Sequence, residues 1–216
     1  NVSNRTLSPD GIVRFTLRND YAKAITAYRD ELGPDGAETS DRILCPRTDC
    51  GIAPGATIDA ILIVSREVTS KPLIISGVLL DDGTADGDPD AILLLREYRL
   101  GESLQMKVVR SLLGEAVGAS SDELPGTLES VESKVKASGD KFTDLTIYPG
   151  GYRAGWVGIG AHTARDFLSQ SLSEVGASFR KDRMTGLVRF QNLVEFVNDK
   201  TTLLDQSVRQ AGMKTQ

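Results

Sequence analysis

The spacing of apolar residues changes near residue 88, and this change constrains the fold more than any other feature of the sequence. Before it, Val13, Phe15 and Leu17 alternate with polar residues, the two-residue period of a half-buried strand. After it, apolar residues recur every three or four positions, as in amphipathic helices. The pattern predicts an α+β chain with an antiparallel, immunoglobulin-like β-sandwich over residues 1–88 and an all-helical domain over residues 89–216.

The first domain is expected to contain about six strands with no helix between them. Turn sequences such as Ser-Pro-Asp-Gly and Gly-Pro-Asp-Gly separate its apolar runs. The expected strands cover residues 2–7, 13–18, 25–32, 42–45, 57–64 and 73–80. Short strands joined directly by turns are typical of a sandwich.

The second domain is expected to contain four helices. Asp88 is a good N-cap for the first, and Pro89 suits its first helical position. Gly101 is expected to kink or break this helix. The other helical patterns cover residues 124–135, 156–175 and about 182–212, and residues 143–148 are predicted to add one strand.

Composition excludes several classes of protein. Hydrophobic residues make up 40% of the 216, which is enough for a sizeable core and excludes a disordered chain. The 25 basic and 30 acidic side chains give a net charge of −5, which argues against a general nucleic-acid binder. No stretch reaches the roughly 18 apolar residues of a transmembrane helix. The chain is therefore expected to fold without a membrane span.

The two cysteines, Cys45 and Cys50, lie in a short turn-forming segment with Pro46 and Asp49. This spacing favours a local disulfide, and the alternative is two free thiols in a surface loop. Disulfides persist in oxidising compartments, so the pair favours a secreted or periplasmic protein. Zinc is not expected, because only one histidine is present to complete four ligands.

Five aspartates fall within the segment Asp81–Asp90. The spacing of Asp82, Thr84 and Asp86 follows the start of a calcium-binding EF-hand loop, and Asp82, Asp86 and Asp88 are candidate metal ligands. Leu93, however, occupies the position of the bidentate glutamate. The alternative is that these aspartates form turns and cap the following helix.

Other candidate catalytic residues are few. His162 is the single histidine, and no Gly-x-Ser-x-Gly nucleophile elbow accompanies it. The glycine-dense segment 150–160 lacks the lysine of a nucleotide-binding loop and is expected to form a flexible loop with close helix packing. Glu97 and Glu102, an acid pair conceivable for glycoside cleavage, are expected to face solvent, as are the basic residues between 180 and 189.

Two segments resemble the N-terminal region of exported acidobacterial proteins of unknown function. They are residues 19–32 with Ile52-Ala53-Pro54-Gly55, and residues 78–88, which run into a leucine-rich helix. The similarity covers roughly residues 11–113. It implies export and a sandwich-like start, and it supplies no catalytic residue. Because the sequence opens at Asn1 without methionine, a mature form that has lost a leader is expected.

The function expected from these observations is binding or assembly at the cell envelope without catalysis, with a protein or envelope component as partner. One alternative is a hydrolase that uses His162 and the Asp81–Asp90 loop at a site between the two domains. Another is an adhesin that calcium stabilises.

Overall fold

The computed structural model describes residues 1–8, 11–32, 37–45, 51–63, 72–138, 147–148 and 152–212. The chain divides into two compact units, residues 1–96 and 97–216. The expected α+β class is confirmed, with antiparallel sheets first and helices after them. The division between the units falls inside the first helix, α1 (Pro89–Val117), rather than at its start.

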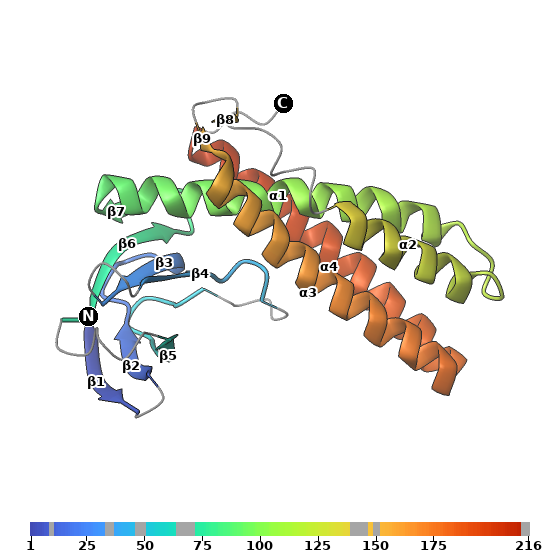
Figure 1. The fold of residues 1–216 in the computed structure, drawn as a ribbon, viewed down its shortest axis with the longest axis horizontal. Coiled ribbons are helices and arrows are strands. Elements are labelled where there is room, and N and C mark those ends of the chain that lie inside the picture. Colours follow the sequence, from blue (N-terminus) through green and yellow to red (C-terminus); the bar gives the residue numbers. More distant parts are fainter. Residues whose placement is uncertain are drawn as a thin grey trace. The chain divides into compact units, whose positions relative to one another are not determined.

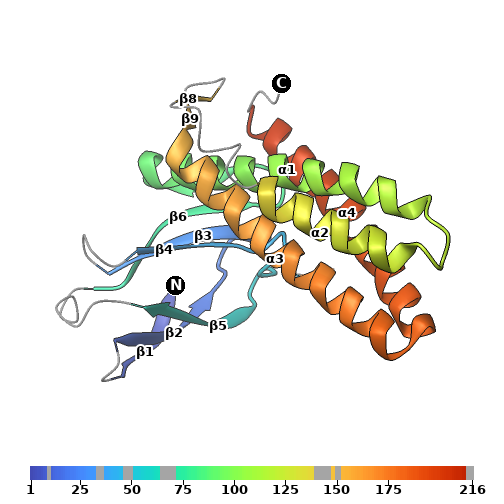
Figure 2. The same ribbon diagram turned by 45° about the vertical axis from the view of Figure 1, so that its right-hand side comes forward.

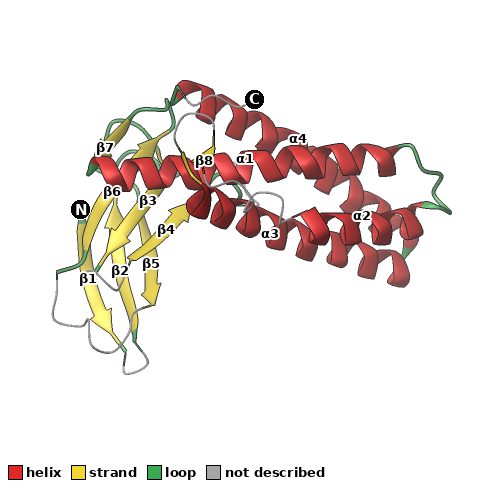
Figure 3. Ribbon diagram, turned by 45° about the horizontal axis from the view of Figure 1, so that its top comes forward, coloured by secondary structure: helices red, strands yellow, loops and turns green. Residues whose placement is uncertain are grey.

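The first unit is a two-sheet sandwich whose strands are yellow in Figure 3. One sheet has the order β1-β2-β5 and the other β4-β3-β6-β7, and the neighbouring strands in both pair antiparallel. This Greek-key order, with the second and fifth strands paired opposite the third and sixth, is that of immunoglobulin-like sandwiches. The strands are β1 (Val2–Leu7), β2 (Ile12–Arg18), β3 (Ile25–Glu31), β4 (Ala37–Asp41), β5 (Thr57–Ile63), β6 (Ile74–Leu80) and β7 (Ala85–Gly87).

The sandwich core forms because alternate residues of each strand point inward. Val13, Phe15 and Leu17 of β2 are at most 2% exposed, as their two-residue spacing predicts. They pack against inward-facing residues of β3, β5 and β6 from both sheets. The remaining buried members of this cluster are Ile25, Tyr28, Leu32, Ile52, Ala60, Leu62, Val78 and Leu80.

The outer face of the second sheet carries a smaller apolar cluster. Ala27 of β3 and Leu79 of β6 pack there against Leu95 of α1. Asp88 begins α1, because its side chain accepts hydrogen bonds from the backbone N–H groups of Asp90 at 2.8 Å and Ala91 at 3.2 Å. The predicted cap is thus confirmed.

Two strands differ from the prediction. Residues 42–45 form a turn, and the strand lies just before them at β4. The sequence of β4, Ala-Glu-Thr-Ser-Asp, shows no apolar alternation because this is an edge strand with little burial. The three-residue β7 was not predicted, since it lies within the aspartate-rich segment.

The second unit contains most of α1 together with α2 (Leu124–Ser138), α3 (Ala154–Lys181) and α4 (Arg183–Gln210). The long helices α3 and α4 run side by side and are joined at Asp182, and α2 lies against α3 (Figures 1 and 2). A short hairpin, β8 (Ile147–Tyr148) with β9 (Tyr152–Arg153), precedes α3. Among the described residues, no helix has the length and apolar character that crossing a bilayer requires.

Helices α1 and α3 cross at two glycines. A β-carbon on Gly101 would overlap the carbonyl oxygen of Val157, and one on Gly160 would overlap that of Tyr98. The two backbones therefore touch where neither has a side chain. The predicted close packing of the glycine-dense segment is confirmed at Gly160, whereas the predicted loop is wrong for residues 154–160, which lie in α3. Of the predicted kink or break at Gly101, the break is wrong, because α1 is continuous through this contact.

Candidate functional site

The second sheet ends in an unusually short strand, which leaves part of its neighbour uncovered. Strand β7 pairs only with residues 77–79 of β6. It stops at Gly87, whose φ of 120° favours glycine and where a β-carbon would collide with the backbone of Ser76. The Asp88 N–H then donates to the Ser76 carbonyl at 2.7 Å, and α1 begins. Ile74 and Ile75 of β6 therefore lie beyond the end of β7.

A cavity of about 480 Å³ lies at this position, between the open edges of the two sheets. Its volume is within the range of ligand-binding pockets, and apolar residues form much of its lining. We call it the β1–β6 groove, and its lining residues are Asn1, Val2, Leu17, Arg18, Tyr21, Ile25, Leu73, Ile74, Ile75, Gly77, Val78, Asp86 and Gly87.

The floor and the mouth of the groove differ in burial. Leu17 and Ile25 at the floor are each 2% exposed and belong to the sandwich core. Ile74 at the mouth is 50% exposed. An apolar group that enters the groove therefore meets the core on one side and covers an exposed isoleucine on the other.

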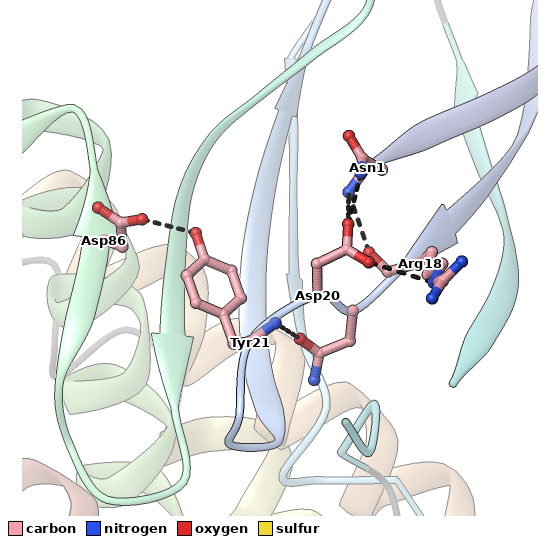
Figure 4. Close-up of polar contacts among 6 residues, drawn as sticks. Asn1, Arg18, Asp20, Tyr21 and Asp86 are labelled. Atoms are coloured by element: carbon pink, nitrogen blue, oxygen red, sulfur yellow. Dashed lines mark hydrogen bonds and ion pairs between the residues drawn. The ribbon is translucent and has the colours of Figure 1, made fainter. Parts of the chain in front are cut away.

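Tyr21 and Asp86 form a polar contact on one wall of the groove. The Tyr21 hydroxyl donates to Asp86 Oδ2 at 2.7 Å (Figure 4). Burial, and then the hydrogen bond to the Asp86 carboxylate, raise the pKa of Tyr21 to about 12. The Tyr21 backbone N–H donates to the Asn19 side chain at 2.9 Å, which fixes the loop that carries the ring.

A second polar group lies at the β1 side of the groove. Arg18 forms an ion pair with Asp20 at 3.1 Å, and the Asn1 side-chain amide also donates to Asp20 (Figure 4). The backbone nitrogen of Asn1 donates to the Arg18 carbonyl at 3.0 Å. Strand β1 is irregular next to this group, with a break in register between Ser3 and Thr6. An irregular edge strand is a poor partner for an additional strand.

The three candidate calcium ligands are each engaged in a separate contact. Asp82 accepts hydrogen bonds from Lys23 and Thr84, which lower its pKa to about 2. Asp86 accepts from Tyr21, and Asp88 caps α1. Within the described part of the chain, no three His, Cys, Asp or Glu side chains are grouped so that they could hold a metal ion. Calcium binding here stays a prediction to which this arrangement adds no support.

Two other predictions concern the cysteine pair and a hydrolase. Cys50 lies outside the described residues, so the Cys45–Cys50 disulfide stays a prediction. His162 lies half-buried in α3 of the second unit, whereas Asp81–Asp90 belongs to the first. The hydrolase that would combine them also stays a prediction.

The expectation that Glu97 and Glu102 face solvent is wrong, since both are at most 1% exposed. Glu97 accepts hydrogen bonds from Arg153, from its backbone N–H at 2.7 Å and from its side chain at 3.0 Å. Six residues further along α1, Ser103 donates to Asp205 of α4 at 2.8 Å. These contacts join α1 to its neighbours, so the polar face of α1 is part of the interior of the helical unit.

Sequence reasoning missed the groove and its polar residues. Tyr21 stands outside the alternating pattern of the strands, and the sequence carries no signal that its hydroxyl meets Asp86, 65 residues away. The sequence feature that could have indicated the groove is the aspartate-rich segment. A strand-to-helix junction with many turn residues leaves room for only a short strand.

Comparison with known proteins found no match: no family model, no curated protein and no solved structure matches the chain.

Proposed function

We propose that this protein is a non-catalytic binding or assembly module of the cell envelope, secreted or periplasmic, whose sandwich binds an extended segment of a partner protein in the β1–β6 groove. The observation that carries this proposal is the uncovered end of β6. A strand that continues the line of β7 beyond Gly87 would lie beside Ile74 and Ile75. Addition of a strand to an open sheet edge is a common mode of peptide recognition.

The shape and chemistry of the groove support an extended apolar segment as the occupant. Strand addition supplies main-chain hydrogen bonds, and alternate side chains of the added strand point into the cavity. There they contact Val2, Ile75 and Val78. The carboxylate of Asp86, held by Tyr21, favours a basic residue where the segment passes it. The irregular β1 directs the segment toward β6.

The test is a selection from a phage-displayed library of random peptides on the full chain, with two variants as comparisons. Ile74→Lys places a charge at the mouth of the groove, where the native side chain is 50% exposed. Ile61→Lys is the matched control, because Ile61 is 48% exposed on β5 of the other sheet. We expect apolar peptides that bind the wild type and Ile61→Lys, and bind Ile74→Lys at least about tenfold more weakly.

Two results would contradict the proposal. One is a selection that enriches no peptide, and the other is equal binding to wild type and Ile74→Lys. The proposed compartment is tested separately, by fractionating cells that express the full-length gene product. Recovery in the cytoplasm alone would exclude the envelope.

A further inference from the structure

Asp30 is a buried carboxyl group inside the sandwich, on the side of β3 that faces the core. It is 2% exposed, and its Oδ1 atom has no hydrogen-bond partner. Burying a carboxylate without compensation is costly, whereas a protonated carboxyl avoids most of that cost. Asp30 therefore needs either a nearby cation or a proton.

Among the residues that the structure describes, the charged groups around Asp30 do not supply that cation. Its register partner in β4 is Glu38, whose charge disfavours a second negative charge on Asp30. Arg29 is next in sequence, and its guanidinium pairs with Glu31 at 2.8 Å. The charge of Arg42 lowers the pKa of Tyr28, whereas the charges of Asp30 and Glu38 raise it. Strand β6, on the other side of β3, has no ionisable side chain.

We infer that Asp30 is a proton-binding site, and that release of its proton next to Glu38 weakens the β3–β4 edge of the sandwich. Burial first, and then the charge of Glu38, raise the pKa of Asp30 to about 7, although backbone N–H groups and Arg29 act in the opposite direction. Burial also raises the pKa of Glu38, against the effect of the Ile63 backbone N–H of β5. The site thus lies where β3, β4 and the end of β5 meet.

The sign of the effect follows from linkage. The folded-state pKa of Asp30 lies above its ordinary value of 3.8, so the folded protein binds this proton more tightly than the unfolded chain does. The resulting stabilisation is complete below pH 3.8 and is lost as the pH rises through about 7. Proton release near neutral pH therefore loosens this edge of the sandwich, independently of any occupant of the β1–β6 groove.

The direct test is an NMR titration of the side-chain carboxyl carbons in the full-length wild type. We expect Asp30 to titrate near pH 7, and Glu38→Gln to move that midpoint to lower pH. A midpoint for Asp30 close to its ordinary value would overturn the inference, as would a midpoint that Glu38→Gln leaves unchanged.

Urea denaturation at pH 5 and pH 8 provides the second readout. For the wild type, the urea concentration at the unfolding midpoint is expected to be lower at pH 8 than at pH 5. Asp30→Asn is expected to remove most of this fall. Asp59→Asn is the control, because Asp59 is an exposed aspartate on β5, and it should keep the wild-type fall. An undiminished fall in Asp30→Asn would overturn the inference. If Asp30→Asn does not fold, the titration of the wild type decides.

Discussion

Gly101 of α1 contacts the backbone of α3 so closely that a β-carbon on it would overlap the carbonyl oxygen of Val157 and lie 2.7 Å from the Ala161 nitrogen. Gly160 makes the reciprocal contact with the backbone of Tyr98. The two helices are thus held at a separation that only glycine allows on either side. This crossing sets the geometry of the helical unit.

Gly101→Ala is therefore expected to destabilise the protein strongly, by about 3 kcal/mol or more, because α1 and α3 must separate to admit a methyl group. Gly114→Ala in the same helix is the matched control, since a β-carbon there meets no atom within 4 Å. That change is expected to stabilise α1 by roughly 0.5–1 kcal/mol through helix propensity. Chemical denaturation measures the free energy of unfolding of both variants. Similar changes in the two would contradict a close contact between α1 and α3 at Gly101.

Tyr21→Phe removes the hydroxyl that donates to Asp86 and is expected to cost about 1 kcal/mol. The folded-state pKa of Tyr21, about 12, exceeds its ordinary value of 10.0. Its contribution to stability is therefore present below pH 10 and is lost as the pH rises through about 12. Absorbance titration of tyrosinate should show one group ionising near pH 12, and this step should be absent in Tyr21→Phe. If the variant keeps the step, the Tyr21–Asp86 contact is not its source.

Asp88→Ala removes the N-cap of α1 and is expected to lower stability by about 1 kcal/mol. Asp88→Asn is the control, because an asparagine oxygen can accept the same backbone hydrogen bonds. Thermal denaturation compares the two variants. Equal losses would show that the charge of Asp88, rather than the cap, is what stabilises the protein.

The separate contacts of Asp82, Asp86 and Asp88 predict that calcium leaves the melting temperature unchanged. Lys23 already neutralises Asp82, so a cation would have to displace it. The measurement is thermal denaturation with excess calcium and with chelator. A rise in melting temperature with calcium that Asp82→Asn abolishes would instead establish the calcium site.

The sequence was sufficient to predict the elements whose apolar residues point to a core. Phe15 and Leu17 marked a strand, and Leu128 and Val131 marked a helix, because burial imposes a period on each. It was not sufficient for β4, whose residues lie at an exposed edge where no period is imposed. The burial of Glu97 could not be predicted from the sequence either, since its partner Arg153 is 56 residues away and only the tertiary fold brings them together.

The groove belongs to the features that a sequence pattern does not reveal. It depends on the length of β7, which ends after three residues at Gly87, just before α1 begins. Its apolar lining residues, such as Ile74 and Ile75 of β6, have the same sequence pattern as other strand residues, and they differ in lying beyond the end of β7. Periodicity predicts which side chains are buried, but it does not show which sheet edge stays open.

Backbone hydrogen exchange at the end of β6 tests the central claim most directly. The measurement compares the amides of Ile74 and Ile75 with and without a peptide selected on the wild-type protein, and it uses the amides of Ile61 and Ile63 in the other sheet as reference. Strand addition predicts that exchange at Ile74 or Ile75 slows by at least about tenfold, while the reference amides change little. Unchanged exchange at both β6 amides with the peptide bound would contradict the account.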